Sequence, residues 1–574
     1  MIAIRLRRTG SSAAVSSRPS FAIRLLPVFC ALTLATLPSH LIGAQFYNDW
    51  AASRFSDVPA QSGPLADPDQ DGQANLFEFA FGTDPRVADS TAQLVFPLSG
   101  GVSGANVEFD VQILERAGHQ SGAQIDLYLS PDLKHWLRPW WLRVTTNSLA
   151  SDPSGSVREQ FTTRLSGTNA WFVRSAVRLL DPGPVTAHYY VATNGSDSNA
   201  GTNIALPFAT LAKTASLANP GDLIYVRGGT YSWTAKISLS RAGTPAQPIR
   251  IRAYPGENPI FDFSGEALGT DAMSVSSNCW QLYGLEFANA GHNAIKVTGN
   301  SNVFERCVFR GSRNTGFNIG SSSVGSLPSY NFILNCDAYR NYDPDGHGGN
   351  ADGFAAKWNI GPGNVFSGCR SWENSDDGWD LWMGISPVLI TNCWTFRNGS
   401  NYFGDTAFAG NGNGFKLGGN FVPAAHRLVG CIAFNNVGNG GNGIDQNNNT
   451  AGLNVDQNST WANRNLDVYL DHGTVTQGVH TVRNNVSLSH TYAIQSGSVQ
   501  TSNTWQVLPA VATSDFLSVD VSFALASRQD DGSLPETPFL RPVPGGNLVD
   551  KGANLGAPFS GSAPDLGAVE SQVW

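Results

Sequence analysis

The sequence is poor in charged residues, which make up 14% of its 574 residues, against roughly 25% in an average soluble protein. The 36 lysines and arginines are outnumbered by 45 acids and form no basic block, which argues against a nucleic-acid-binding protein. Methionine is nearly absent, with three residues. Hydrophobic residues still reach 41%, enough for a large core, so the composition excludes a disordered chain.

Glycine and tryptophan are plentiful instead, with 61 and 15 residues. A glycine-rich, aromatic-rich and charge-poor composition favours a large secreted β protein. The length allows two or three domains, at roughly 150 residues for each.

The first 44 residues have the features of an export signal. The segment carries no acid and five arginines, namely Arg5, Arg7, Arg8, Arg18 and Arg24. An apolar run over 25–37 follows, too short to span a bilayer. We expect cleavage after Ala44, which changes the net charge from −9 to −14. This predicts a secreted protein, extracellular or periplasmic, with no membrane contact; a buried or anchoring N-terminal helix is the alternative.

Segment 45–89 contains a complete calcium-loop pattern. Gly72 stands at the sixth position of the loop, where a sharp turn is needed. Oxygen ligands are offered at the other positions by Asp67, Asp69, Asp71, Gln73 (through its carbonyl), Asn75 and Glu78. The loop resembles those of dockerin-like segments in secreted bacterial enzymes. Because it has no paired partner, we expect a structural Ca²⁺ site rather than a sensor.

Residues 90–187 alternate apolar and polar side chains in short stretches, which predicts a small β-sandwich-like accessory domain. The expected strands cover 107–113, 125–129 and 171–179. Three tryptophans lie between the second and third of these: Trp136, Trp140 and Trp141. Either they fill the core or they form a sugar-binding platform, and we favour the core.

From residue 188 to residue 574 the chain repeats itself. A Cys-x-x-aromatic-x-Asn pattern recurs at 336–341, 369–374, 393–398 and 431–436, with coils of roughly 22–25 residues lengthened by loops. A repeat of this length is typical of a solenoid, which buries its core by stacking. An opening helix over 206–217 and the β-rich coils around it predict a right-handed parallel β-helix, and hence an all-β protein.

Two columns of side chains follow from the stack. The repeated asparagines form a ladder at a turn, where we expect a left-handed backbone conformation: Asn341, Asn374, Asn398, Asn436 and Asn463. The cysteines at one equivalent inward position are interpreted as buried free thiols and not as disulfides: Cys307, Cys336, Cys369, Cys393 and Cys431.

A second sequence pattern recurs in the same coils. Its alternation of side chains predicts two columns of residues on the face of the strands that points away from the core. The first column is Asn293, Thr315, Asp352, Asp377, Asn413 and Asn442. The second is Lys296, Asn318, Ala355, Asp380, Lys416 and Asp445. Because adjacent strands lie about 4.8 Å apart, Asp352, Asp377 and Asp380 converge, and Asp376 joins them. Calcium suits such a cluster; an exposed acidic stripe with a surface Asp380–Lys416 salt bridge is the alternative.

Three motifs with these residues resemble the signature of polysaccharide lyase family nine. They are residues 351–357 (Ala-Asp-Gly-Phe-Ala-Ala-Lys), 374–382 (Asn-Ser-Asp-Asp-Gly-Trp-Asp-Leu-Trp) and 412–418 (Gly-Asn-Gly-Phe-Lys-Leu-Gly). The resemblance covers roughly 188–574 and excludes the calcium loop and the accessory domain. It implies a pectate-lyase-like parallel β-helix enzyme.

The resemblance also implies roles for the residues that match its motifs, with no departure at any of these positions. Calcium is expected on Asp352, Asp376, Asp377 and Asp380, with Lys416 as the base. The implied reaction is β-elimination on an acidic plant cell-wall polysaccharide, polygalacturonate or pectin, by a protein that we expect to be monomeric. Rhamnogalacturonan or another uronate polymer is the nearest alternative substrate. A β-helix glycoside hydrolase, or a non-catalytic carbohydrate-binding or adhesin solenoid, is the alternative of another class.

Overall fold

The computed structural model describes residues 187–571 apart from 255, 324, 474–477, 530–531, 557–558 and 560. Before residue 187 it describes the strands given below and residues 54, 57, 61, 68–69 and 85–87. The chain divides into two compact units. One comprises 1–186, 554–564 and 571–574, and the other comprises 187–553 and 565–570.

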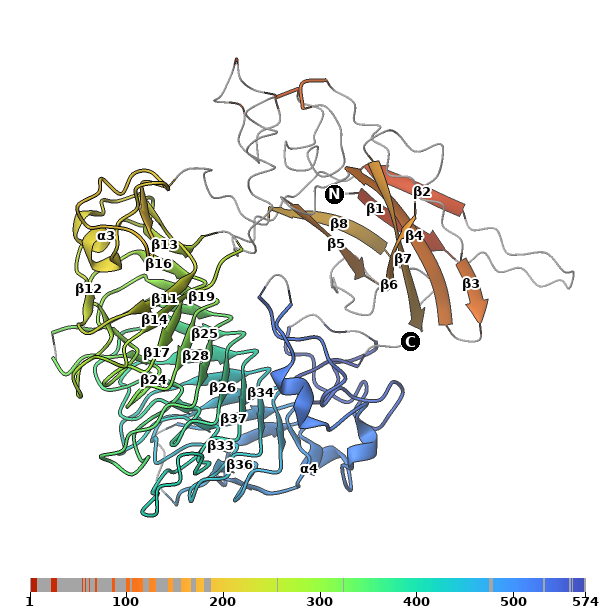
Figure 1. Cartoon of the computed structure of the whole chain (residues 1–574). Helices are drawn as coiled ribbons and strands as arrows, with labels where there is room; N and C mark the ends of the chain where they lie inside the picture. The colour runs from red at the N-terminus through yellow and green to blue at the C-terminus, as the bar shows by residue number, and fades with distance from the viewer. Residues whose placement is uncertain are drawn as a thin grey trace, which may run out of the picture. The chain divides into compact units, whose positions relative to one another are not determined.

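The first unit contains two antiparallel sheets of four strands (Figure 1). One has the order β2 (Ala22–Pro27), β1 (Ile2–Arg7), β8 (Phe172–Leu179) and β5 (Ala123–Ser130). The other has the order β3 (Gly100–Ser103), β4 (Asn106–Arg116), β7 (Ser156–Ser166) and β6 (Arg143–Asn147). The expected strands are confirmed as β4, β5 and β8, while the sandwich-like packing stays a prediction.

Three other sequence predictions fall in this part of the chain. The export signal stays a prediction about processing, although β1 and β2 lie within its 44 residues. The calcium loop, apart from residues 68 and 69, lies outside the described residues, as do the three tryptophans of the accessory domain.

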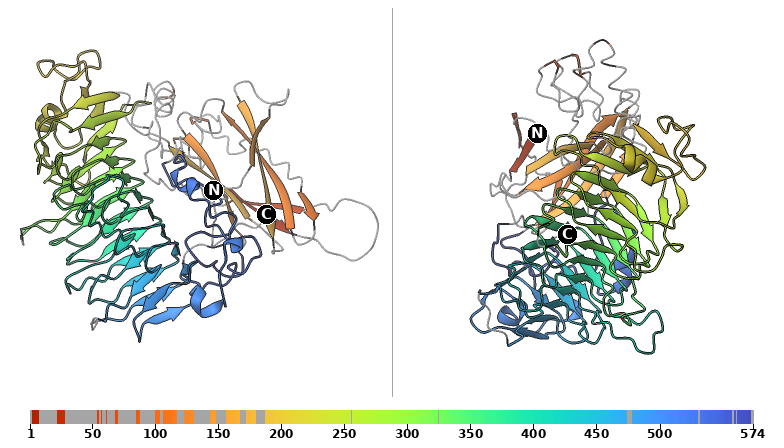
Figure 2. Two further views of the ribbon diagram at one scale, coloured as in Figure 1. Left: turned by 60° about the horizontal axis from the view of Figure 1, so that its bottom comes forward. Right: turned by 90° about the vertical axis from the view of Figure 1, so that its left-hand side faces the viewer.

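The second unit is a stack of coils with three parallel sheets (Figures 1 and 2). The first sheet has twelve strands: β9 (Tyr189–Val191), β10 (Leu223–Val226), β13 (Ile249–Ala253), β16 (Trp280–Tyr283), β19 (Val303–Glu305), β22 (Phe332–Leu334), β25 (Asn364–Ser367), β28 (Val388–Thr391), β31 (Arg427–Val429), β34 (Asn454–Asp456), β37 (Thr481–Arg483) and β40 (Val499–Thr501).

The second sheet has ten strands: β11 (Gly229–Ser232), β14 (Pro259–Asp262), β17 (Glu286–Ala288), β20 (Val308–Arg310), β23 (Asp337–Tyr339), β26 (Arg370–Trp372), β29 (Trp394–Phe396), β32 (Ile432–Phe434), β35 (Ser459–Trp461) and β38 (Val486–Ser487). The third also has ten: β12 (Ile237–Leu239), β15 (Met273–Val275), β18 (Ile295–Val297), β21 (Phe317–Ile319), β24 (Phe354–Ala356), β27 (Trp379–Asp380), β30 (Phe415–Lys416), β33 (Ile444–Asp445), β36 (Val468–Leu470) and β39 (Tyr492–Ile494).

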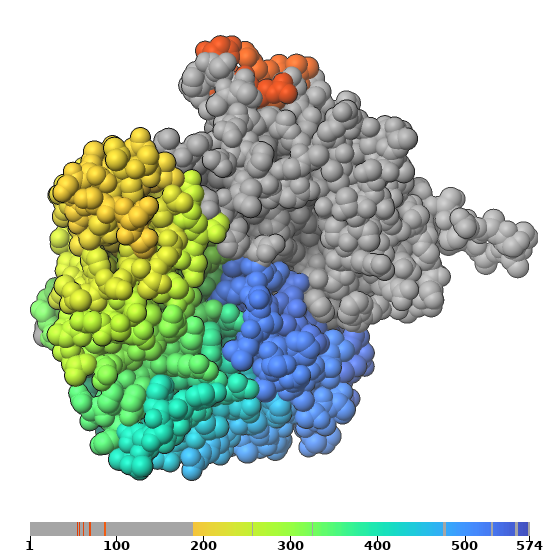
Figure 3. Space-filling model, viewed as in Figure 1, coloured from red at the N-terminus to blue at the C-terminus, as the bar shows by residue number. Residues whose placement is uncertain are grey.

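In the first sheet β9 pairs with β10. From β10 onward each strand pairs with the strand three elements later, so that every coil adds one strand to each sheet. This is the parallel β-helix that the repeat predicts. On the surface the coils form successive bands in sequence order (Figure 3).

The core of the stack is made of equivalent inward side chains from successive coils. Phe261 and Phe287 stack with ring centroids 5.5 Å apart. Trp379 lies between Phe354 and Phe415, at 4.8 and 5.0 Å. All five are at most 1% exposed, and burial of each large apolar side chain contributes about 1.5–3 kcal/mol to stability. Because equivalent side chains of successive coils stack on one another, even short strands bury a continuous core.

The cysteine column is present as predicted. All five cysteines are buried and free, and Cys279 is a sixth buried free thiol. Backbone N–H groups of Cys336, Cys369 and Cys393 each donate to the Sγ atom of the cysteine one coil later, at 3.4–3.5 Å. The thiols therefore act as small buried groups that accept hydrogen bonds along the stack.

The asparagine ladder is confirmed, but its predicted backbone conformation is wrong. The Nδ2 atom of Asn374 donates to the Oδ1 atom of Asn398 at 3.0 Å, and the same bond joins every neighbouring pair in the ladder. The left-handed residue is the one before each asparagine: Arg340, Glu373, Arg397, Asn435 and Ala462. The asparagines occupy their positions because a buried amide can donate to the next coil and accept from the coil before it.

Two short segments cover the ends and one face of the stack. Helix α3 (Leu211–Leu217) starts later than the predicted 206–217 because the Thr210 side chain caps it, accepting from the Lys213 N–H at 3.1 Å. After α4 (Thr504–Val507) and the 3₁₀ turns η3 (Thr513–Asp515) and η4 (Val521–Leu525), the chain packs on the second sheet. There Phe539 contacts Trp394 and Phe434.

Within the described part of the chain, no helix combines the length and apolar character needed to cross a membrane.

The cysteine column predicts the outcome of a thiol titration. The chain without residues 1–44, denatured without reductant, should release six thiols per molecule, while the native protein should react slowly because all six are buried. A pair of thiols missing from the denatured count would contradict the free-thiol interpretation.

Candidate active site

The third sheet carries one column of polar side chains in the predicted order. Lys296, Asn318, Ala355, Asp380, Lys416 and Asp445 are paired in register on six successive strands, β18 to β33. Any two neighbours in this column are separated by one strand spacing, about 4.8 Å. Asp380 therefore lies directly beside Lys416, as the sequence predicts.

The other predicted column, which contains Asp352, Asp377 and Asn413, lies where the chain enters these strands, and it also stacks as predicted. The N–H of Gly353 donates to the Asp377 carbonyl at 3.0 Å, and the N–H of Gly378 donates to the Asn413 carbonyl at 2.8 Å. A Cβ atom on either glycine would lie 2.0 Å from a side-chain hydroxyl, that of Ser371 or of Thr395. The Asp-Gly pairs of the repeat therefore arise because only glycine fits beside the acid.

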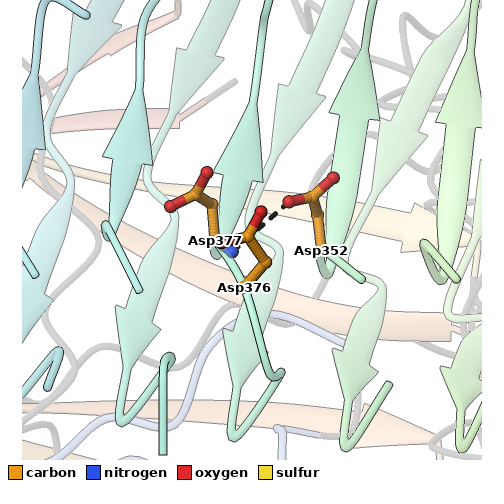
Figure 4. A group of neighbouring side chains, drawn as sticks. All are labelled: Asp352, Asp376 and Asp377. Carbon is orange, nitrogen blue, oxygen red and sulfur yellow. Dashed lines mark hydrogen bonds between the residues drawn. The ribbon is translucent and has the colours of Figure 1, made fainter. Parts of the chain in front are cut away.

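Three of the four predicted acids converge on one point (Figure 4). Asp352, Asp376 and Asp377 each place a carboxylate oxygen within 4.8 Å of the other two. Asp376 and Asp377 belong to one coil and Asp352 to the coil before it. All three are at most 3% exposed, as is Asp380 at 2%. The alternative of an exposed acidic stripe is therefore wrong.

Backbone groups fix the carboxylates in place. Asp352 accepts from the Asp377 N–H at 3.3 Å, and Asp377 accepts from the Asn413 N–H at 2.7 Å. Asp376 accepts from the Asn411 N–H at 2.7 Å. Asn411 belongs to the inserted loop 399–412, so this loop closes against the acids.

Two lysines, not one, pair with the acid cluster. The Nζ atom of Lys416 lies 2.9 Å from Asp377 and 3.5 Å from Asp380. The Nζ atom of Lys357 lies 2.8 Å from Asp352 and 2.6 Å from Asp380. The sequence singles out Lys416 through the register, whereas Lys357 follows its strand and belongs to neither column.

Burial and mutual repulsion disfavour the charged forms of the acids in this cluster. Burial raises the pKa of Asp352 to about 7, although Lys357 opposes the shift. Burial, with the charges of Asp377 and Asp352, raises the pKa of Asp376 well above its usual value. Burial disfavours the charged form of Lys416, but the surrounding carboxylates raise its pKa well above the usual value.

The four acids fit a divalent cation by their chemistry. Four carboxylates against two ammonium groups leave the fully ionised cluster with a net charge of −2, which one such ion would neutralise. All the donors are oxygens, which hard cations such as Ca²⁺ prefer. The residues that could hold the ion are Asp352, Asp376, Asp377 and Asp380.

A pocket of about 350 Å³ opens over the cluster. Trp358 and Trp382 line it and meet edge to face, with ring centroids 6.3 Å apart. Apart from Gly349, the remaining lining residues are polar: Asp271, His292, Asn293, Lys296, Asn314, Asn318, Asn350, Lys357, Asp376, Asp380 and Lys416. Aromatic rings beside amide and charged groups suit a charged sugar chain.

Three other basic residues, which lie close to the three motifs in the sequence, do not line this pocket. His347 is exposed and pairs with Asp405 at 3.0 Å. Arg370 forms an ion pair with Asp337 at 2.8 Å. His426 is fully buried and accepts a backbone N–H, and burial lowers its pKa to about 3.

The chain matches the family model described as "Pel9A-like, right handed beta helix region" over residues 189–485. It is 42% identical over 394 residues to pectate lyase L of Dickeya dadantii (strain 3937), covering 67% of this chain and 90% of that protein. It is 33% identical over 419 residues to pectate lyase PEL9 of Emericella nidulans, covering 66% of this chain and 97% of that protein.

Two solved structures share the fold. The crystal structure of pectate lyase Pel9A superposes with a TM-score of 0.62 at 41% identity, covering 67% of this chain and 96% of that one. A rhamnogalacturonan lyase superposes with a TM-score of 0.52 at 28% identity, covering 62% and 96%. The right-handed parallel β-helix is thus confirmed, and the chain belongs to the Pel9A-like family of pectate-lyase-like enzymes, polysaccharide lyase family nine.

Proposed function

We propose that this protein is a secreted, calcium-dependent pectate lyase that cleaves polygalacturonate by β-elimination, with Lys416 as the base. The observation that carries the proposal is the buried cluster of four acids next to Lys416, which comprises Asp352, Asp376, Asp377 and Asp380. Asp376, Asp380 and Lys416 line one pocket. The 42% identity to pectate lyase L of Dickeya dadantii supports the substrate.

The substrate offers a weakly acidic C–H bond for this site. In a galacturonate residue the C5 hydrogen is adjacent to a carboxylate, and the polysaccharide chain continues through O4. Ca²⁺ held by the four aspartates would act as a Lewis acid toward that carboxylate and lower the cost of charge that develops on it.

Lys416 is placed to take the C5 proton. Its Nζ atom lines the pocket, and an amine accepts a proton only in its neutral form. Asp377 and Asp380 favour the charged form, so their own charge must be compensated before Lys416 acts as a base. After proton transfer the C5–H electron pair forms the C4–C5 double bond. The C4–O4 bond breaks, and O4 leaves with its electron pair and takes a proton from solvent.

A second candidate substrate is rhamnogalacturonan. The rhamnogalacturonan lyase of similar fold supports this alternative. Its cleavage would use the same acids and the same base, because the sugar that loses its proton is again a galacturonate. Hydrolysis or carbohydrate binding without catalysis does not agree with membership of a lyase family.

The other components of the proposal concern the rest of the chain. The loop with Asp67, Asp69, Asp71, Gln73, Asn75 and Glu78 is proposed to hold a structural Ca²⁺. Residues 1–44 are proposed to direct export of a monomeric enzyme, to a compartment where pectin is accessible.

The reaction type and substrate are tested by ultraviolet absorbance. Polygalacturonate should give a product that absorbs through its new C4–C5 double bond, faster than rhamnogalacturonan does. A chelator should abolish the signal, and added Ca²⁺ should restore it. New reducing ends without absorbance would contradict elimination, and full activity in chelator would contradict the role of calcium.

Lys416 is tested by substitution with alanine. Lys416→Ala should lower kcat about 10²–10⁴-fold, the usual contribution of a general base. Lys551→Ala is the control, because Lys551 is exposed and does not line the pocket. Circular dichroism and Ca²⁺ titration should show a folded protein. Activity within a few-fold of wild type would exclude Lys416 as the base.

The cation site is tested with Asp376→Asn. Asparagine can still accept from the Asn411 N–H but carries no charge. Ca²⁺ at 100 times Kd should stabilise the wild type by about 2.7 kcal/mol, and this gain should largely disappear in the variant. Without Ca²⁺ the variant should melt at a higher temperature, because one buried charge is removed. Equal calcium stabilisation of the two proteins would contradict the assignment of Asp376.

A further inference from the structure

The pocket extends beyond the acid cluster to a second basic group, Lys296. Lys296 lies on β18 in the same column as Asp380, three strands earlier in the third sheet. The backbones of these two residues are therefore about 14 Å apart, three strand spacings. Both side chains line the same pocket.

Lys296 differs from the other two lysines of the pocket in its partners. Lys357 and Lys416 each pair with two carboxylates of the acid cluster. Among the described residues, no carboxylate lies within ion-pair distance of the Lys296 Nζ atom. In the described part of the chain its one hydrogen-bond acceptor is the Oδ1 atom of Asn318, at 3.1 Å.

The surroundings hold the Lys296 ammonium group in place without neutralising it. It lies over the ring of Trp358, 5.3 Å from the centroid, and the Asn318 side chain that it contacts is buried. The nearby Asp271 is occupied by His292 at 2.7 Å and by the Asn293 amide at 2.8 Å. An ammonium group has three donors, and two are left for a ligand.

Burial disfavours the charged form of the Lys296 side chain. Burial lowers the pKa of Lys296 to about 8, although the negative charge of Asp271 acts to raise it. The positive charge of Lys357 also lowers this pKa. An anion that enters the pocket would offset the effect of burial and form a hydrogen bond with a charged donor. The lysine is therefore oriented, incompletely paired and open to the pocket.

We propose that Lys296, with Asn318 and the face of Trp358, binds the carboxylate of a second uronate residue of the same polysaccharide chain. The proposal rests on the proposed function, since it takes a polyuronate as the ligand. The backbones of Lys296 and Asp380 lie three strand spacings apart, and we take this separation to exceed one sugar ring. The residue bound there is therefore a neighbour of the one that is cleaved.

The other residues of the column agree with a chain that runs toward the earlier coils. Ala355 lies between Asn318 and Asp380 and projects only a methyl group. On the opposite side of Lys416 the next residue is Asp445, which is held by His472 at 2.6 Å. Of the lysines in the described column, the one without a carboxylate partner therefore lies on the side of the earlier coils, at Lys296.

Lys296→Met tests the proposal, because methionine keeps most of the aliphatic volume and loses the charge. KM for polygalacturonate should rise roughly tenfold, as expected when a hydrogen bond to a charged group is lost, with kcat within about twofold. The Kd for Ca²⁺ without substrate should not change. Lys296→Arg should recover most of the loss, and the exposed Lys551→Met should behave as wild type.

The outcomes separate this proposal from the proposed function. If KM is unchanged, or if kcat falls while KM does not, Lys296 does not bind substrate. A lower melting temperature with weaker Ca²⁺ binding in Lys296→Met would show a structural role and overturn the proposal. If the wild type forms no unsaturated product, calorimetric titration with oligogalacturonate still decides: tighter binding by wild type than by Lys296→Met supports the carboxylate site, and equal binding rejects it.

Discussion

The hydrogen-bonded register between successive coils is the constraint on which both the core and the site depend. Each strand of the third sheet is only two or three residues long from β18 to β33. Such short strands are held in place because every coil repeats the same inward and outward positions as the coil before it. A slip of one residue would exchange Trp379 with Asp380 and place a carboxylate in the core. The apolar column and the acidic column therefore enforce the same register.

This register also explains how so many charges are buried together. Stacking at about 4.8 Å brings like groups closer than their mutual repulsion favours. The compensation comes from groups fixed by the same stack: the backbone N–H groups that Asp352, Asp376 and Asp377 accept, and the two ammonium groups of Lys357 and Lys416. The structure thus keeps all four acids close together in one fixed arrangement. A divalent cation held by this cluster would offset its unfavourable charge.

The sequence predicts those features that repeat and misses those that do not. The columns through Asp352 and Asp380 follow from the period alone, as does the row of cysteines. Lys357 lies beyond the end of its strand, and a flexible four-carbon side chain carries its charge to Asp352, so no period indicates the contact. Asn411 reaches Asp376 from an inserted loop whose path no repeat determines. The sequence predicts the left-handed position one residue too late, because hydrogen bonding and not backbone conformation selects the ladder asparagines.

A net charge of −9 does not prevent this protein from acting on a polyanion. Charges on other surfaces are screened beyond a Debye length of about 8 Å at physiological ionic strength, so the substrate experiences mainly the groups that line the pocket. Three lysines line the pocket, and two of them, Lys357 and Lys416, are paired with the acids. A cation held by the carboxylates would leave Lys357 and Lys416 less tightly paired and change the local field from negative to positive. Recognition of an acidic polymer and activation of the base would then depend on the same event, the neutralisation of four buried aspartates.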